Sequence, residues 1–141
     1  MSIGAAILGC SGPKLTVEER TFFRRVKPWG FILFGRNVVD PAQLASLMHD
    51  LRAVLAPEAV MMVDQEGGRV ARLRPPHWPA YPSAARIAAL GEDAAAAARV
   101  VARLIADDLT GLGVTVDCLP VLDLPAPGAD AIIGDRAYGT K

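Results

Sequence analysis

The chain has 141 residues, of which 52% are hydrophobic and 21% are charged, so it can bury a substantial core and a folded domain is expected rather than disorder. Fifteen Lys and Arg balance fifteen Asp and Glu, and the absence of a basic run excludes nucleic acid and an anionic membrane surface as expected partners. No apolar stretch reaches the roughly 18 residues that a membrane-spanning helix needs, and no signal peptide is recognised, so we expect a cytoplasmic protein that binds a neutral small molecule.

The first third of the chain alternates apolar runs with a capped helical segment. The run 5–9 is typical of a short buried strand. Thr16-Val17-Glu18-Glu19 forms a capping box, which predicts a helix that runs towards Lys27 and ends at Pro28. The run 30–34 is continuously apolar, so we expect a second strand that is buried on both faces and has parallel neighbours.

A second helix is predicted to start at Asp40-Pro41, because an N-cap residue followed by proline is a common helix start. Apolar residues at three- and four-residue steps predict that one face of this helix packs on the core. They are Leu44, Leu47, Met48, Leu51 and Leu55. The run 60–63 predicts a third strand, and a Pro-rich segment with Pro75, Pro76, Pro79 and Pro82 follows it. Long ordered loops of this kind are often functional.

An Ala-rich helix is predicted over 92–110, with Ala97, Val101, Leu104 and Ile105 on its packing side, and a fourth strand is predicted over 114–119. Four strands that alternate with three helices, without a hairpin signal, indicate a parallel βαβ architecture, open or closed. No linker interrupts it, so 1–141 is expected to be a single partial domain. Cys10 and Cys118 fit neither a metal motif nor a disulfide framework, and we expect reduced thiols within strands.

Polar residues follow the strands where functional groups of parallel α/β proteins gather. Arg36 and Asn37 follow the second strand, the run 64–69 follows the third, and Asp123 follows the fourth. Asp64 comes directly after four apolar residues, so its carboxylate must be paired or face a cavity. A carboxylate followed by arginines suits the hydroxyl, acetamido and carbonyl groups of a sugar. An Asp–Arg ion-pair network that braces the rim is equally compatible with these residues.

The glycine pair Gly67-Gly68 allows a sharp turn or a close approach of the backbone to a ligand. It is not part of a phosphate-binding loop, because neither G-x-G-x-x-G nor G-x-x-x-x-G-K-[ST] occurs in the chain. Nucleotide binding is therefore not indicated, and no metal or organic cofactor is expected.

Four segments, in this order along the chain, resemble glycoside hydrolase family 3. They are Ile32-Leu33-Phe34-Gly35-Arg36-Asn37, then Asp64-Gln65-Glu66-Gly67-Gly68-Arg69-Val70 with Arg72 and Leu73, then Pro120-Val121-Leu122-Asp123, then Ile133-Gly134-Asp135-Arg136-Ala137-Tyr138-Gly139. More narrowly, the chain resembles the compact bacterial β-N-acetylhexosaminidases of cell-wall recycling. The resemblance implies an α/β fold, namely the N-terminal half of a TIM (β/α)₈ barrel with about four βα units. Because a complete barrel typically needs about 250 residues, the chain is expected to be incomplete.

The resemblance also implies roles for individual residues. Asp64 is expected to hydrogen-bond hydroxyls of a terminal N-acetylglucosamine, and Arg72 and Arg136 are expected to donate to the same sugar. Glu66 and Arg69 are expected to hold the loop by ion pairs. For Arg36 and Asn37 a structural role is favoured over contact with the sugar.

The reaction implied is that of a retaining exo-β-N-acetylglucosaminidase that acts on peptidoglycan fragments. Such enzymes need a nucleophilic carboxylate and an acid/base group, which in the similar enzymes are a late Asp and a His on a mobile loop, both expected beyond Lys141. His49 and His77 do not match that position and are expected to be surface or packing residues, so no catalytic residue is assigned. Neither Asp64 with Glu66 nor Asp117 with Asp123 is expected to form a catalytic pair.

The alternative function is a non-catalytic half-barrel that binds sugar or associates with itself. It rests on the four open parallel strands, because an open sheet leaves two unpaired edges that favour association between copies.

Overall fold

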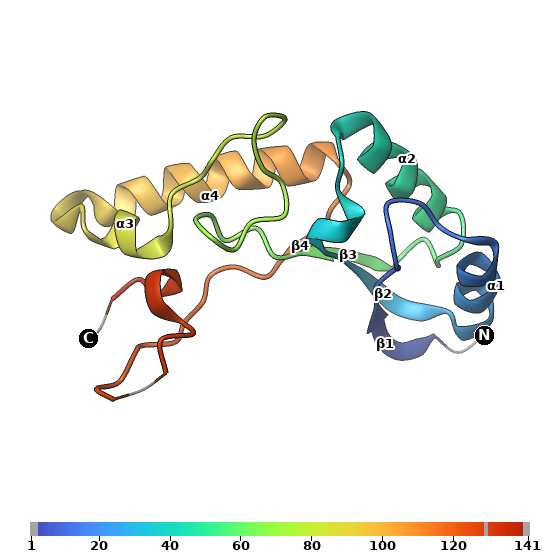
Figure 1. Cartoon of the computed structure of the whole chain (residues 1–141), viewed down its shortest axis with the longest axis horizontal. Helices are drawn as coiled ribbons and strands as arrows, with labels where there is room; N and C mark the ends of the chain where they lie inside the picture. Colours follow the sequence, from blue (N-terminus) through green and yellow to red (C-terminus); the bar gives the residue numbers. More distant parts are fainter. Residues whose placement is uncertain (1–2, 129, 140–141) are drawn as a thin grey trace. The chain divides into compact units, whose positions relative to one another are not determined.

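The computed structural model describes residues 3–128 and 130–139. Its helices and strands are β1 (Gly4–Leu8), α1 (Val17–Val26), β2 (Pro28–Leu33), α2 (Pro41–Arg52), β3 (Val60–Val63), α3 (Ala84–Ala88), α4 (Ala94–Gly111) and β4 (Val116–Asp117), with 3₁₀ turns at Gly35–Asn37, Gly91–Asp93 and Gly134–Arg136 (Figure 1). The chain divides into two compact units. Unit 1 comprises 1–63 with 109–117, and unit 2 comprises 64–108 with 118–141.

The four strands lie in one sheet in the order β1-β2-β3-β4, and every neighbouring pair is parallel. Phe31 is opposite Met61 and Leu33 is opposite Val63, so alternate residues of β2 and β3 share one face. The predicted parallel βαβ architecture is confirmed. The structure adds the short helix α3, which the sequence analysis missed because five residues show no clear periodicity.

Both predicted helix starts are confirmed. The side chain of Thr16 accepts a hydrogen bond from the Glu19 amide at 3.1 Å, and the Glu19 carboxylate accepts one from the Thr16 amide at 2.9 Å. The Asp40 carboxylate caps α2 by accepting from the Gln43 amide at 2.8 Å. These bonds satisfy amides that would otherwise lack a partner at the helix start. The termination of α1 is also explained, because Lys27 adopts a left-handed conformation with φ of 50°.

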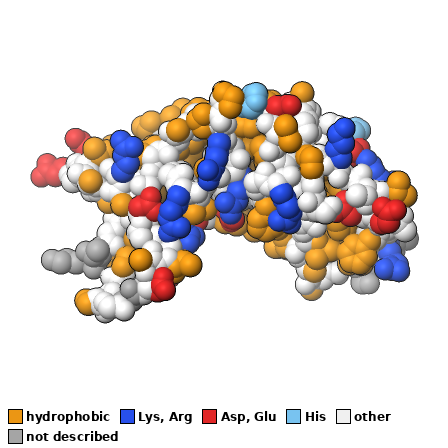
Figure 2. All heavy atoms as spheres, in the orientation of Figure 1, with side chains coloured by type: hydrophobic (Ala, Val, Ile, Leu, Met, Phe, Trp, Pro, Cys, Tyr) orange, Lys and Arg blue, Asp and Glu red, His pale blue; other side chains and the backbone are white. Residues whose placement is uncertain are grey.

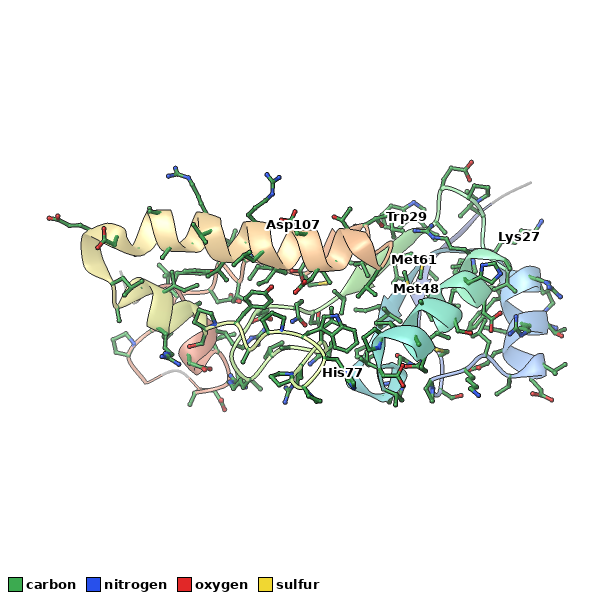
Figure 3. The ribbon with its side chains drawn as sticks, turned by 90° about the horizontal axis from the view of Figure 1, so that it is seen from above. Lys27, Trp29, Met48, Met61, His77 and Asp107 are labelled. Atoms are coloured by element: carbon green, nitrogen blue, oxygen red, sulfur yellow. The ribbon has the colours of Figure 1, made fainter. Side chains whose placement is uncertain are left out.

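The core of unit 1 lies between one face of the sheet and the two helices α1 and α2. Phe31 and Met61 are fully buried on that face, and the ring of Phe23 from α1 meets Phe31 edge-on with 5.0 Å between ring centroids. The predicted α2 stripe supplies the opposite wall, with Leu44, Leu47, Met48 and Leu51 buried. Met48 and Met61, which are labelled in Figure 3, both belong to this core. Each such side chain stabilises the fold by about 1.5–3 kcal/mol.

The prediction that the first strand is buried is wrong, because no residue of β1 is classed as buried. Ala5 and Ile7 are exposed, and Ile7 retains 38% of its accessible surface. The reason is positional, since β1 is an edge strand and α1 and α2 bury the other face of the sheet. An apolar run alone does not distinguish an edge strand from a central one.

Several predicted boundaries also differ from the structure. The predicted strands 5–9 and 30–34 are β1 at 4–8 and β2 at 28–33, and the predicted helix 92–110 is α4 at 94–111. The fourth strand was predicted over 114–119, whereas β4 has two residues, Val116 and Asp117, opposite Met62 and Val63, and Thr115 before it bonds Met61 through its amide and its side chain. Cys10 and Cys118 consequently lie just after strands rather than within them.

The packing side of α4 is only partly as predicted. Ile105 is buried as expected, and Leu109 is buried with it, but Leu104 retains 48% of its surface. No helix in the described part of the chain is long and apolar enough to cross a membrane. Figure 2 shows hydrophobic side chains over much of the face in view, with charged side chains of both signs among them.

Candidate functional site

The candidate site is built in unit 2 on the segment that follows β3. Gln65 is buried, and its side-chain oxygen accepts hydrogen bonds from the amides of Arg72 at 2.8 Å and Leu73 at 3.0 Å, while its nitrogen donates to the Leu73 carbonyl at 3.0 Å. The Glu66 amide also donates to the Val70 carbonyl at 2.9 Å. The segment therefore folds back on itself, and the buried side chain of Gln65 holds residues 72 and 73 beside its start. No sequence pattern indicates this role for Gln65.

This fold-back brings the side chains of Asp64 and Arg72 together. Nη2 of Arg72 donates to Oδ2 of Asp64 at 2.5 Å, and each side chain retains 23% of its surface. Nε of Arg72 is buried and has no hydrogen-bond partner within the described residues. The ion pair considered in the sequence analysis is thus present. It leaves one oxygen of the carboxylate and several N–H groups of the guanidinium outside this bond.

Gly67 and Gly68 form the tip of the turn and approach the Pro-rich segment closely. Gly67 has φ of 85°, and a Cβ added there would lie 2.3 Å from the Pro82 carbonyl oxygen. Gly68 has φ of 55°, a Cβ on it would lie 2.6 Å from Cβ of Ser83, and its amide donates to the Tyr81 carbonyl at 2.9 Å. The sharp turn predicted for the glycine pair is present, and the backbone that it approaches closely is the protein's own chain, whereas a ligand was the predicted alternative. This close approach docks the turn on residues 81–83.

Two ion pairs connect the same turn to the segment 132–138. Nε and Nη2 of Arg136 donate to the two carboxylate oxygens of Glu66 at 2.8 and 2.7 Å. Nε of Arg69 donates to Asp135 at 2.9 Å, and its Nη2 donates to the carbonyls of Ile132 and Ile133. The ion pairs predicted for Glu66 and Arg69 are therefore present, and Asp135 is the partner that the sequence analysis did not identify.

Two further carboxylates lie close enough to Arg136 to affect its pKa. Its pKa is raised, mainly because Glu66 accepts its hydrogen bonds, and the negative charges of Asp64 and Asp123 add to the effect. The pKa of the Tyr138 phenol is raised by burial and by the negative charge of Glu66. Asp64, Arg72 and Arg136, the three residues assigned to sugar binding, thus share one electrostatic neighbourhood with Asp123 and Tyr138.

A hollow of about 540 Å³ in unit 2 includes Asp123 and Tyr138 in its lining. The rest of the wall is largely aliphatic and comes from α4 and from residues 119–124. A sugar needs several hydrogen-bond partners to replace water. The hollow by itself therefore does not have the chemistry of a sugar subsite.

The Pro-rich segment is fastened to α4 through Tyr81, whose hydroxyl donates to the Asp108 carboxylate at 2.7 Å. Burial and this hydrogen bond raise the pKa of Tyr81 from 10.0 to about 12. A raised pKa means that the protonated phenol stabilises the folded state. This contribution is complete below about pH 10 and is lost as the pH rises through 12.

We expect Tyr81→Phe to lower the free energy of unfolding by about 1 kcal/mol at neutral pH, because one hydrogen bond to a partly exposed carboxylate is removed. The difference between the wild type and the variant should shrink as the pH rises from 10 to 12. Denaturant titrations at a series of pH values measure it. A difference that stays constant across that interval would contradict the assigned role of the hydroxyl.

Arg36 and Asn37 lie in unit 1, and both side chains are engaged by the protein itself. Nε of Arg36 donates to the Cys10 carbonyl at 2.9 Å, and its guanidinium lies 4.5 Å from the centroid of the Phe34 ring. Asn37 is fully buried; it donates to the Gly12 carbonyl at 2.8 Å and accepts from the Phe34 amide at 2.9 Å. These contacts agree with the structural role favoured from the sequence.

Asn37→Ala is expected to lower the free energy of unfolding by about 2–3 kcal/mol, because the fully buried amide side chain no longer bonds the partly buried Gly12 carbonyl and Phe34 amide. Gln43→Ala is a suitable control. Gln43 also bonds backbone groups through its amide, but two of its three side-chain bonds are exposed. Chemical unfolding of both variants tests the difference, and an equal loss in the two would contradict a special role for Asn37.

The two histidines do not join the site. His49 is exposed on α2, and His77 is exposed in the Pro-rich segment, with its ring edge-on to Trp78 at 5.9 Å between centroids (Figure 3). Within residues 3–128 and 130–139 no group of three or more His, Cys, Asp or Glu is arranged to hold a metal ion. Asp64 and Glu66 are each paired with an arginine, and Asp117 and Asp123 belong to different units.

Comparison with known proteins gives consistent matches over most of the chain. Residues 12–141 match the family model of the glycosyl hydrolase family 3 N-terminal domain. A β-hexosaminidase of Methylococcus capsulatus is 39% identical over 127 residues, which cover 90% of this chain and 37% of the relative. A β-hexosaminidase of Alkalilimnicola ehrlichii is 37% identical and is matched over 100% of this chain and 41% of its own length. The chain thus spans about two fifths of the length of these relatives.

Solved structures of similar proteins match the chain over most of its length as well. Native NagZ from Neisseria gonorrhoeae has a TM-score of 0.84 at 32% identity, covering 98% of this chain and 41% of that chain. The same protein in complex with N-trifluoroacetyl-D-glucosamine has a TM-score of 0.85, with 98% and 42% covered. A glycoside hydrolase family 3 β-N-acetylglucosaminidase from Paenibacillus sp. has a TM-score of 0.83 at 31% identity, with 94% and 26% covered.

Proposed function

This chain belongs to glycosyl hydrolase family 3 and forms the N-terminal half of the family's α/β TIM barrel. From this membership we propose that the whole protein is a retaining exo-β-N-acetylglucosaminidase. It would remove terminal N-acetylglucosamine from β-linked amino sugars. The names of the relatives support this activity, as does the N-acetylglucosamine analogue bound to the similar protein from Neisseria gonorrhoeae. In this proposal residues 1–141 form one partial domain.

The observation that carries the proposal is that the three residues expected to bind the sugar keep part of their side-chain surface, as do Arg69 and Asp135 with 50% and 43%, whereas Glu66 is covered. Asp64, Arg72 and Arg136 retain 23%, 23% and 25% of their side-chain surface, whereas Glu66 retains 6%. The three residues assigned to the sugar are therefore accessible to a ligand, and Glu66 is not. The partly exposed guanidinium of Arg72 keeps N–H groups outside its bond to Asp64, and a sugar oxygen is a suitable acceptor for them.

The charges of the site suit a neutral ligand. Asp64 pairs with Arg72, Glu66 with Arg136, and Asp135 with Arg69, so each of these three arginines has a carboxylate partner. A neutral sugar would then exchange hydrogen bonds with the outward-facing atoms without adding charge. Asp64 would accept bonds from sugar hydroxyls, and the two arginines would donate to hydroxyl or acetamido oxygens.

The catalytic groups belong to the same proposal. A nucleophilic Asp and an acid/base His are expected in the part of the relatives that this chain does not cover, so we assign no catalytic residue within 1–141. We also propose that the substrates are peptidoglycan fragments and that the protein acts in the cytoplasm during their recycling. Cell fractionation and hydrolysis of muropeptides test these two points separately.

The test of the activity is hydrolysis of a chromogenic β-N-acetylglucosaminide by the intact protein, with the isolated chain 1–141 assayed beside it. The intact protein should release the chromophore, and the sugar should first appear as the β-anomer by NMR, as retention of configuration requires. No release by the intact protein would refute the proposed function. Release as the α-anomer would refute the retaining mechanism.

A second candidate function is sugar binding without hydrolysis by this chain. It is favoured by the pairing of both Asp64 and Glu66 with arginines, because such pairs suit residues that hold a ligand or brace the loop. Calorimetry with N-acetylglucosamine tests it, and heat of binding without any hydrolysis by the intact protein would favour it over the enzyme. Self-association of the chain, the other alternative, is tested by size-exclusion chromatography.

A further inference from the structure

The turn 64–70 and the segment 132–138 are joined by two ion pairs. In one the turn supplies the negative charge, and in the other it supplies the positive charge. Glu66 contributes the negative partner to Arg136, and Arg69 contributes the positive partner to Asp135. The partners are 70 and 66 positions apart in the sequence, so the contacts are tertiary and do not arise from local structure. If the segment 132–138 shifted by one residue along the turn 64–70, Asp135 would face Glu66 and the two carboxylates would repel each other. The order of the charges therefore favours one position of the segment relative to the turn.

The two pairs differ in burial, which separates their effects. Arg69 and Asp135 retain 50% and 43% of their side-chain surface, and exposed pairs of this kind contribute little energy. Glu66 retains only 6% of its surface and accepts two hydrogen bonds from one guanidinium. A buried, two-bonded pair fixes both the position and the plane of the guanidinium group.

This geometry has a consequence for Arg136. Glu66 engages Nε and Nη2, so Nη1 is the nitrogen not used in the pair. Rotation of the guanidinium would break both bonds at once. The direction in which Arg136 presents its remaining donors is thus set by Glu66.

We propose that Glu66 is a positioning residue, which orients Arg136 for contact with the sugar without touching the sugar itself. This inference rests on the proposed function, because Arg136 is a sugar-binding residue only within it. It assigns Glu66 an effect on substrate affinity that passes entirely through Arg136. An effect of this kind should disappear when Arg136 can no longer form the two-bonded pair.

The test uses Glu66→Gln, Arg136→Lys and the double variant in the intact protein. Glutamine keeps the shape of Glu66 but places an NH₂ group where the second acceptor was, so KM for a chromogenic N-acetylglucosaminide should rise about tenfold. Arg136→Lys should have a similar effect, and the double variant should be no worse than either single one. Additive losses in the double variant would overturn the inference. Asp107→Asn, which breaks the exposed pair of Arg103 and Asp107 on α4 (Figure 3), is the control for loss of an ion pair.

A second readout does not depend on activity. Slow rotation of the Arg136 guanidinium, seen by NMR as separate Nη1 and Nη2 signals, should be present in the wild type and the Asp107→Asn variant and lost in Glu66→Gln. Retention of slow rotation in Glu66→Gln would overturn the inference. If that variant does not fold, Glu66→Asp, which keeps the charge and shortens the reach, is assayed in its place and should also raise KM. Absence of wild-type hydrolysis would refute the proposed function, and the NMR result would still decide whether Glu66 orients Arg136.

Discussion

Replacement of Gly67 with alanine is expected to lower the free energy of unfolding of the protein by about 2–5 kcal/mol. Two costs combine. A non-glycine residue at φ of 85° is strained by about 1–2 kcal/mol, and the new Cβ would lie 2.3 Å from the Pro82 carbonyl oxygen, which is backbone and can move only with its neighbours. The turn and the Pro-rich segment would have to separate.

Chemical unfolding measures the effect of Gly67→Ala, and Gly111→Ala is the matched control. Gly111 ends α4, a Cβ there would meet no atom within 4 Å, and its φ is not positive. Alanine at such a position should leave stability unchanged or raise it by about 0.5 kcal/mol. If the two variants unfold at the same denaturant concentration, the close packing of the turn on residues 81–83 does not stabilise the protein.

The sequence predicts those parts of the fold whose signals are local. The capping box at Thr16 and the Asp40-Pro41 start each depend on residues within one helical turn, and both helices begin where predicted. The order of strands follows from the alternation of runs and helices. The length of β4 was not predictable in this way, because it depends on which of its residues pair with β3, and that contact is not local in the sequence.

The sequence indicated which charged residues belong to the candidate site, but not which of them pair with one another. The run after β3 identified Asp64, Glu66 and Arg69 as charged groups at a strand end, and each indeed forms an ion pair. Nothing near Arg69 in the sequence indicates that its partner is Asp135, because the path of the chain between them decides which residues meet. For the same reason the glycine pair predicted a close approach, while its neighbours, Pro82 and Ser83, became known only from the structure.

The second large effect is expected from Asp64→Asn, which should lower kcat/KM for a chromogenic N-acetylglucosaminide by about 10- to 100-fold. A hydrogen bond to a charged group contributes about 1.5–3 kcal/mol, and each 1.36 kcal/mol corresponds to about a tenfold change in rate. Asparagine keeps one acceptor oxygen but removes the charge, and it places a donor NH₂ beside either Arg72 or the sugar hydroxyls. The steady-state kinetics of the intact protein measure the loss.

Asp50→Asn separates the binding role of Asp64 from its role as an ion-pair partner. Asp50 pairs with Arg20 at 2.5 Å, the same distance as between Asp64 and Arg72, and both side chains retain 30% of their surface. The two substitutions therefore remove the same charge from nearly equivalent pairs, one in unit 1 and one in the candidate site. If Asp64 serves only to brace the rim, both variants should lose similar stability and neither should lose activity selectively. A loss of kcat/KM confined to Asp64→Asn, at matched stability, is the result that a role in sugar binding requires, either by direct contact or through its partner Arg72, since the Asp50 pair in unit 1 holds no residue assigned to the sugar.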